Sequence, residues 1–238
     1  MTDVINIDGI TFSYRRPKKL IFRDFTTTFT SGQITCILGY NGAGKTTLLK
    51  LIYGILRPKE GLIAINNELV SNYADIFILS DRFGICPELS LRQNLVFRCR
   101  LHSLDTSPIL AHPLIYDFGM ARFIDTPANK LSAGYFTRAN IVTGLVFQPS
   151  LVMLDEPTSS IDPATRELLQ GTLAKQRMSG TSIILVTHDL DFAYAVGDRL
   201  IVIDEGNIVV DSLSPRDIPI EAFRNEYILH TESDALQC

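Results

Sequence analysis

The glycine-rich segment at residues 39–46 combines residue types and a spacing that suit phosphate binding. It fits the pattern GxxxxGK followed by Ser or Thr, and reads Gly39, Tyr40, Asn41, Gly42, Ala43, Gly44, Lys45, Thr46. Backbone N–H groups of a tight glycine loop can converge on phosphate oxygens because no side chains intervene. Lys45 supplies a full charge for the β- and γ-phosphates, and the Thr46 hydroxyl is a natural Mg²⁺ ligand. The segment therefore predicts a phosphate-binding loop.

Two carboxylates follow an apolar run further along the chain. Residues 151–154 read as a buried strand, and Asp155 and Glu156 come directly after it. Ligands of open α/β sheets bind at the carboxyl ends of the strands, so we expect Asp155 to face the phosphate loop and to hold Mg²⁺, through water. Glu156 is then the candidate general base for a water that attacks the γ-phosphate.

Short β-branched apolar runs alternate with helical patterns along the chain. The runs read as buried strands at residues 34–38, 151–154, 183–186 and 200–203. Residues 46–56 and 163–178 read as helices, the first ended by Pro58 and the second by Gly180. This alternation predicts a mostly parallel sheet with helices on its faces.

The remaining segments predict additions to that sheet. Apolar and polar residues alternate at residues 5–12, 21–30 and 61–70. This alternation favours an antiparallel sheet beside the parallel one. Helical patterns such as 89–101 predict a small helical lobe inserted at residues 82–139. The tail after Ser212 is broken by Pro215 and Pro219, and we expect a short appendage there.

Composition excludes several classes of protein. The 238 residues are 46% hydrophobic and 20% charged, which is enough for one core with a small lobe and excludes a disordered chain. The net charge of −4 argues against nucleic acid as the main partner. The sequence has no long apolar run and no basic, apolar leader, so we expect neither a membrane span nor a secretory signal. Its four scattered cysteines predict reduced thiols.

Three further positions could carry chemistry. The segment LSAGY at residues 131–135 precedes a helical stretch at 136–147, and Ser132 and the N–H groups around Gly134 could cap that helix or bind an anion. His188 follows the strand at 183–186, where it is either a satisfied strand-end histidine or a phosphate contact.

Taken in order, these segments resemble the nucleotide-binding subunit of ABC (ATP-binding cassette) transporters over nearly all of the chain. GYNGAGKTT matches the Walker A loop, LSAGY stands where the family has its LSGGQ signature, and LVMLDEP matches Walker B with its catalytic glutamate. Residues 159–162 stand at the D-loop, His188 matches the switch histidine, and Tyr14 matches the aromatic residue that stacks on adenine.

The resemblance implies a role for each of these residues. Glu156, His188 and Lys45 would be catalytic, and Thr46, Asp155 and Asp81 would hold Mg²⁺. The residues that would bind ATP within one subunit are Tyr14, Gly39, Tyr40, Asn41, Gly42, Ala43, Gly44, Lys45, Thr46 and Thr47. Two subunits would dimerise head to tail around MgATP, so that Ser132 and Gly134 contact the γ-phosphate bound by the partner.

The resemblance also implies an architecture. We expect one ABC ATP-binding domain over residues 1–238, with an α/β fold that joins a P-loop NTPase core, an antiparallel β subdomain and an inserted helical subdomain. The core would span approximately residues 1–80 and 140–212, the helical subdomain 81–139 and the appendage 213–238.

The chain departs from the family at two positions. Asp81 stands where the family has its Q-loop glutamine; an ionised aspartate can reach Mg²⁺ but donates no hydrogen bond. Tyr135 replaces the last residue of the signature, while Ser132 and Gly134 remain. A weakened signature would slow the opposite site, which leads to the hypothesis of a heterodimer with unequal sites.

The leading hypothesis is a cytoplasmic ATPase subunit, peripheral on the membrane, that drives a separate transmembrane permease subunit. The short length of the chain fits compact subunits and slightly favours an exporter over an importer. One alternative is a soluble ABC-type ATPase for cofactor assembly, or a macromolecular clamp. Another is a regulatory, low-turnover subunit of a heterodimer.

Overall fold

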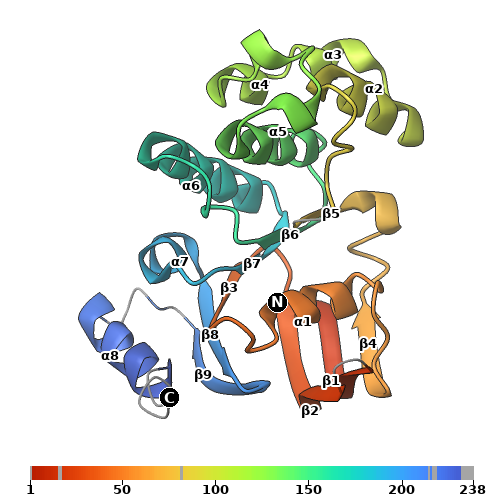
Figure 1. The fold of residues 1–238 in the computed structure, drawn as a ribbon. Helices are drawn as coiled ribbons and strands as arrows, with labels where there is room; N and C mark the ends of the chain where they lie inside the picture. The colour runs from red at the N-terminus through yellow and green to blue at the C-terminus, as the bar shows by residue number, and fades with distance from the viewer. Residues whose placement is uncertain (1, 16–17, 81–82, 214, 216–218, 232–238) are drawn as a thin grey trace.

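A mixed six-stranded sheet forms the centre of the fold in the computed structural model, which describes residues 2–15, 18–80, 83–213, 215 and 219–231 (Figure 1). Its strands are β3 (Ile34–Leu38), β5 (Ile76–Leu79), β6 (Leu151–Asp155), β7 (Ser182–Val186), β8 (Arg199–Asp204) and β9 (Asn207–Leu213). They lie in the order β5-β6-β7-β3-β8-β9, and every neighbouring pair is parallel except β8 with β9. The predicted parallel sheet is confirmed, and the carboxyl ends of β3, β6 and β7 meet at one edge.

A second, antiparallel sheet lies beside the first, as predicted. It has the order β2-β1-β4, with β1 at Asp3–Arg15, β2 at Lys18–Thr30 and β4 at Glu60–Ile65. The segment expected to extend to residue 70 therefore ends earlier. The Asn66 side chain accepts a bond from Glu68 N, and the Asn66 carbonyl from Val70 N, so the chain turns there.

The helices fall into two groups. Around the main sheet lie α1 (Lys45–Ile52), α6 (Pro163–Met178), α7 (Leu190–Val196) and α8 (Ile220–Thr231). The helical lobe, at the top of Figure 1, contains α2 (Leu91–Leu101), α3 (Thr106–Leu110), α4 (Pro113–Asp117), α5 (Ala133–Leu145) and the short turns η2 (Ala121–Phe123) and η3 (Ala128–Lys130). A further turn, η1 (Tyr73–Asp75), precedes β5. The boundary expected at residue 139 falls within α5.

Both faces of the six-stranded sheet are buried, which explains why its strands read as continuous apolar runs. In β6, Val152 and Leu154 belong to a core cluster shared with α5, α6, α7 and the helical lobe. Leu151 and Met153 of the same strand belong to a second cluster, shared with α1 and the antiparallel sheet. Alternate residues of one strand thus hold two layers together.

Two helices differ from what the sequence indicated: α1 is shorter, and α8 was not predicted. The helix expected over 46–56 ends at Ile52 because Gly54 adopts a positive φ of 82° and Leu56 N–H donates back to Lys50 O at 3.1 Å. The tail contains a helix that the sequence did not predict: α8 buries Phe223 completely, and Arg224 of α8 pairs with Asp191 of α7 at 2.7 Å.

Across the described ranges, no helix combines the length and the apolar character that a membrane span requires.

Candidate functional site

The phosphate loop joins β3 to α1 along a path that only glycine can follow at two points. Gly39 has φ 148° and Gly44 has φ 110°. A Cβ at position 39 would lie 2.2 Å from Ile203 O, and one at position 44 would lie 2.8 Å from Phe22 Cζ. Gly44 is the N-cap of α1 and forms no side-chain cap, so the first N–H groups of the helix face the loop without a side chain over them.

Lys45 is buried and its ammonium is folded back onto the loop. Nζ donates to Gly39 O at 2.6 Å and to Tyr40 O at 3.0 Å. Burial lowers the pKa of Lys45, while the charges of Glu156 and Asp155 act in the opposite direction. The cation therefore sits beside two carboxylates and can exchange two carbonyl partners for phosphate oxygens.

Thr46 and Asp155 meet across the edge of the sheet. The Thr46 hydroxyl lies 3.0 Å from Asp155 Oδ1. A hydroxyl and a carboxylate side by side suit Mg²⁺, which is typically bound by one or two protein oxygens together with phosphates and water. Within the described part of the chain, no three His, Cys, Asp or Glu side chains cluster closely enough to hold a metal ion by themselves. The donor set fits a magnesium ion that arrives with phosphate oxygens.

Glu156 stands at the end of β6 in a left-handed backbone conformation, with φ 50°. Its N–H donates to Val186 O of β7 at 2.9 Å, which fixes its position between two strands. Its Oε2 lies 2.8 Å from His188 Nδ1 and accepts from Thr187 Oγ1 at 3.3 Å and from His188 N at 3.4 Å. Thr187 and His188, which directly follow β7, therefore hold the Glu156 carboxylate in place. Strained backbone of this kind is commonly found at functional sites.

Lys45, Thr46 and Glu156 line one cavity of about 330 Å³, and Asp155 and His188 reach it through their contacts with Thr46 and Glu156. Its walls are Tyr14, Lys19, Ile21, Asn41, Gly42, Gly44, Lys45, Thr46, Thr47 and Glu156. At its outer wall the Tyr14 hydroxyl lies 3.2 Å from Thr47 Oγ1, and Phe12 meets the Tyr14 ring edge-on. Tyr40 and Ala43 line an adjoining cavity of about 350 Å³ instead. The structure thus brings most of the predicted residues to one place.

Ser132 and Gly134 are not brought into that cavity. Ser132 is the N-cap of α5, where its hydroxyl accepts from Tyr135 N at 3.5 Å, so the helix begins three residues before the expected position. A Cβ at Gly134 would lie 2.8 Å from Ser160 O, which brings the signature segment (131–135) against the D-loop. Asp81 lies outside the described residues.

Sequence reasoning missed three neighbours of the carboxylates. Thr187 contacts Glu156, and Ser80 and Asn140 share with Asp155 and Glu156 a second cavity, of about 360 Å³, on the side of the helical lobe. One signal was available for Asn140, because it is a polar residue inside an apolar helical run.

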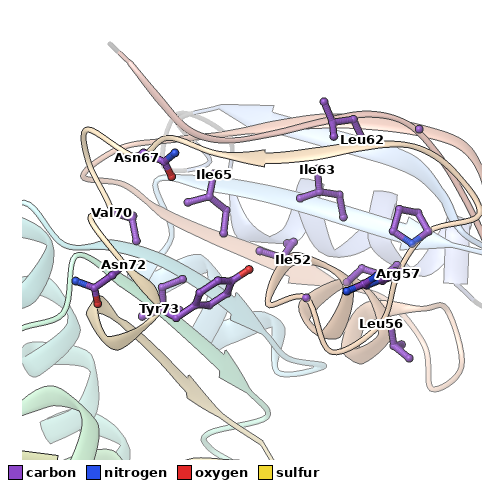
Figure 2. A pocket seen from close by; sticks show the side chains of 15 residues that line it. Ile52, Leu56, Arg57, Leu62, Ile63, Ile65, Asn67, Val70, Asn72 and Tyr73 are labelled. Carbon is purple, nitrogen blue, oxygen red and sulfur yellow. The ribbon is translucent and has the colours of Figure 1, made fainter. Parts of the chain in front are cut away.

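The cavity shown in Figure 2 lies elsewhere. It measures about 430 Å³, is lined mainly by residues around α1, β4 and η1, and contains none of the predicted site residues. Its volume alone therefore gives no reason to place the chemistry there.

Comparison with known proteins agrees with this geometry. The pattern that defines the ABC transporter family matches residues 22–159. The ergothioneine transport ATP-binding protein EgtV of Helicobacter pylori (strain G27) is 31% identical over 211 residues, which cover 85% of this chain and 98% of that protein. The carnitine transport ATP-binding protein OpuCA of Listeria monocytogenes serotype 1/2a (strain 10403S) is 31% identical over 232 residues, or 93% of this chain and 57% of that protein.

A solved structure shares the fold. A dimeric ATP-binding cassette in a post-hydrolysis state, bound to ADP and Pi, superimposes with a TM-score of 0.79 at 23% identity, over 88% of this chain and 98% of that one. The predicted family and fold class are confirmed. The chain belongs to the ABC transporter family, as an ATP-binding subunit that hydrolyses ATP.

Proposed function

We propose that the chain binds ATP with Mg²⁺ at the phosphate loop and uses Glu156 as the general base for hydrolysis. One observation carries this proposal: the Lys45 ammonium, the Thr46–Asp155 pair and the Glu156–His188 pair gather at the edge where three parallel strands end. When bound, Mg²⁺ neutralises charge on the phosphates during attack. Tyr14, at the outer wall of the cavity, would stack on adenine.

Each residue has a task that follows from its contacts. Lys45 trades its two carbonyl partners for oxygens of the β- and γ-phosphates, where partial burial strengthens the attraction. Glu156 takes the proton of the attacking water, and His188, with Nδ1 on the carboxylate, holds that base in place. The other ring nitrogen of His188 remains for the γ-phosphate.

The second part of the proposal is a head-to-tail dimer with another ATP-binding subunit, identical or not. Ser132 is exposed at the start of α5, whose first turn carries no acidic side chain, and a helix N-terminus favours an anion. Among the described residues, Ser132 and Gly134 are not part of the lining of the cavity that contains Lys45 of the same chain, which supports contact with the partner's nucleotide. The matched cassette structure is dimeric.

The third part is a transmembrane permease subunit bound to the helical lobe, with this chain peripheral on the cytoplasmic face of the membrane. The two relatives are named as transport ATP-binding proteins. Phe97 and Leu101 of α2, and Leu104 just after it, are large exposed apolar side chains that a partner could cover. The direction of transport stays a prediction, and the lean toward export draws no support from the comparisons.

The variant Glu156→Gln tests the role of the base. It keeps the size of the side chain but removes the carboxylate, so we expect ATP to bind and remain, and the chain to elute as an ATP-dependent dimer in size-exclusion chromatography. Glu167→Gln, an exposed change on α6, is the matched control and should behave as wild type. A Glu156→Gln protein that stays monomeric and hydrolyses ATP normally would show that Glu156 is not the base.

Co-purification tests the permease. A polytopic membrane protein that elutes with the chain after mild detergent extraction supports the transport role. A chain that elutes without one favours the soluble ATPase instead.

A further inference from the structure

A lysine near the start of β2 lies beside the phosphate loop. Lys19 pairs with Tyr14 in the antiparallel register of β2 and β1, and its side chain reaches the loop at Gly42. A Cβ built on Gly42 would lie 3.8 Å from Lys19 Nζ, which is an ordinary van der Waals distance. Lys19 is exposed, so its ammonium stands on the solvent side of the loop, whereas the Lys45 side chain is buried.

Lys19 lines both cavities around the loop. It shares the cavity of about 330 Å³ with Lys45 and Glu156, and the adjoining cavity of about 350 Å³ with Asp204 and Glu205. In the part of the chain that the structure describes, its ammonium forms no hydrogen bond and no ion pair, not even with Asp204 or Glu205. An ammonium has three donors and no acceptor, so Lys19 is available to an anion that enters the first cavity.

The strand that carries Lys19 is packed tightly against the loop. Ile21, two residues further along β2, has a close neighbour on each side. A Cβ on Gly44 of the phosphate loop would lie 2.9 Å from Ile21 Cγ2, and a Cβ on Gly206, in the turn between β8 and β9, would lie 1.8 Å from Ile21 O. The start of β2 is therefore held in place although the Lys19 side chain is exposed, which lowers the entropy cost of an interaction there.

The order of groups around the first cavity indicates which anion Lys19 would meet. Tyr14 lies at the outer wall, opposite Lys19 in the hairpin, and the proposed function places adenine on its ring. The proposed function also places the β- and γ-phosphates at Lys45. A nucleotide that extends from Tyr14 to Lys45 brings its phosphate chain to the segment of the loop beside Lys19. The charge of that chain favours a second cation on the side that Lys45 does not reach.

We propose that Lys19 is a second phosphate-binding cation, which contacts the phosphate chain of the nucleotide from the solvent side while Lys45 contacts it from the buried side. The inference rests on the proposed function, because it needs a nucleotide at the phosphate loop. Since the charge of Lys19 is exposed, its contribution to nucleotide affinity depends on salt. ADP and ATP both carry a phosphate chain at the loop, so both should depend on Lys19.

Two variants of Lys19 separate its charge from its apolar stem. Lys19→Met keeps an unbranched side chain without the charge, and Lys19→Arg keeps the charge. In isothermal titration calorimetry of the full chain with ADP and Mg²⁺, we expect Lys19→Met to bind about fivefold more weakly than wild type. Lys19→Arg should bind within about twofold of wild type, because it restores the cation. In steady-state hydrolysis, KM for ATP should rise in Lys19→Met as the ADP affinity falls.

Two further measurements complete the test. Lys175→Met removes an exposed charge of α6 that lines neither cavity, so this matched control should bind ADP as wild type does. Raising the salt from about 0.05 M to about 0.5 M should narrow the difference in ADP affinity between wild type and Lys19→Met, because salt screens an exposed charge. A contribution from the shape of the side chain would not respond to salt in this way.

Three outcomes would overturn the inference: an unchanged ADP affinity in Lys19→Met, a Lys19→Arg variant as weak as Lys19→Met, or a difference that salt does not change. A lower melting temperature of Lys19→Met with unchanged ADP binding would assign Lys19 to the fold around the β8–β9 turn instead. Failure of the proposed function is distinct, because Lys45→Ala would then retain tight ATP binding whatever the Lys19 variants do.

Discussion

The phosphate loop and the signature segment each begin a helix, but different forces shape them. At the phosphate loop, Gly44 caps α1 with φ 110° and no side-chain bond. At the signature segment, Ser132 caps α5 with φ −63° and a hydroxyl that accepts from Tyr135 N. The first conformation is available only to glycine, whereas the second is ordinary backbone held by side chains.

The side chains around the signature come from three elements: the turn η2, helix α5 itself and the N-cap of α6. The Tyr135 hydroxyl bonds to Arg122, and the Tyr135 ring lies 4.9 Å from the Arg138 guanidinium carbon and 4.5 Å from the Phe123 ring centroid. Arg138 also pairs with Asp162, the N-cap of α6. Tyr135, which departs from the family pattern, is therefore held by neighbours that fit it. The conformation of the phosphate loop depends on glycines, which can be recognised in the sequence. The surroundings of the signature segment depend on contacts between elements, which cannot be recognised in a local sequence pattern.

The largest loss of stability and ATP binding should come from replacing the glycine that the phosphate loop requires at position 44. Gly44→Ala forces a side chain into φ 110° and places its Cβ 2.8 Å from Phe22 Cζ and 2.9 Å from Ile21 Cγ2. We expect strain and crowding to cost about 2–5 kcal/mol of unfolding free energy and to abolish ATP binding. Urea unfolding and equilibrium nucleotide binding would measure both effects.

Gly171→Ala is the matched control for that prediction. Gly171 lies inside α6, and a Cβ there would meet nothing within 4 Å. Because alanine favours the helix, this variant should gain about 0.5–1 kcal/mol. If both glycine variants lose stability equally, conformation at Gly44 is not what the loop depends on.

The same contrast between local patterns and contacts across the fold explains which features the sequence predicts. Residues 34–38 and 163–178 were located correctly because a doubly buried strand and a capped helix are local patterns. The contact of Asn140 with Gly84 could not be predicted, because it depends on how α5 packs against a distant segment. For α8 a signal was present but misread: Pro219 precedes the helix directly, where proline favours a helix start rather than a break.

An intermediate effect should come from Tyr135→Gln. The variant removes the ring that Arg122, Arg138 and Phe123 contact, so we expect a loss of about 1–2 kcal/mol in unfolding free energy. Tyr116→Gln, at an exposed tyrosine of α4, controls for the loss of an aromatic residue and should change stability little. Equal losses in the two variants would mean that the contacts around Tyr135 contribute nothing.

The same variant tests the hypothesis of unequal sites. If Tyr135 weakens the signature, the glutamine that the family has at this position should raise kcat for ATP even as stability falls. Turnover and melting temperature would then move in opposite directions. A kcat that falls together with the melting temperature would show that tyrosine is the better residue among these neighbours.

The smallest effect should come from Asp162→Asn, which keeps a capping side chain but removes the charge that faces Arg138. The pKa of Asp162 is lowered from 3.8 to about 2. Hydrogen bonds from Thr165 are the main cause, and the positive charge of Arg138 contributes less. A folded-state pKa below the ordinary value means that the carboxylate stabilises the fold fully above about pH 4 and loses this effect as the pH falls toward 2. The Asp162 side chain is 48% exposed, so the melting temperature at pH 7 should fall by no more than about 2 °C.

That difference in melting temperature between wild type and Asp162→Asn should shrink between pH 4 and pH 2, and it should also shrink in high salt, because exposed charges are screened. Asp162→Ala removes the cap as well as the charge and should keep part of its loss at low pH. A difference for Asp162→Asn that does not change with pH would assign the contribution to hydrogen-bond geometry instead of charge. The contact between the signature helix and the D-loop would then depend on shape, as the phosphate loop does.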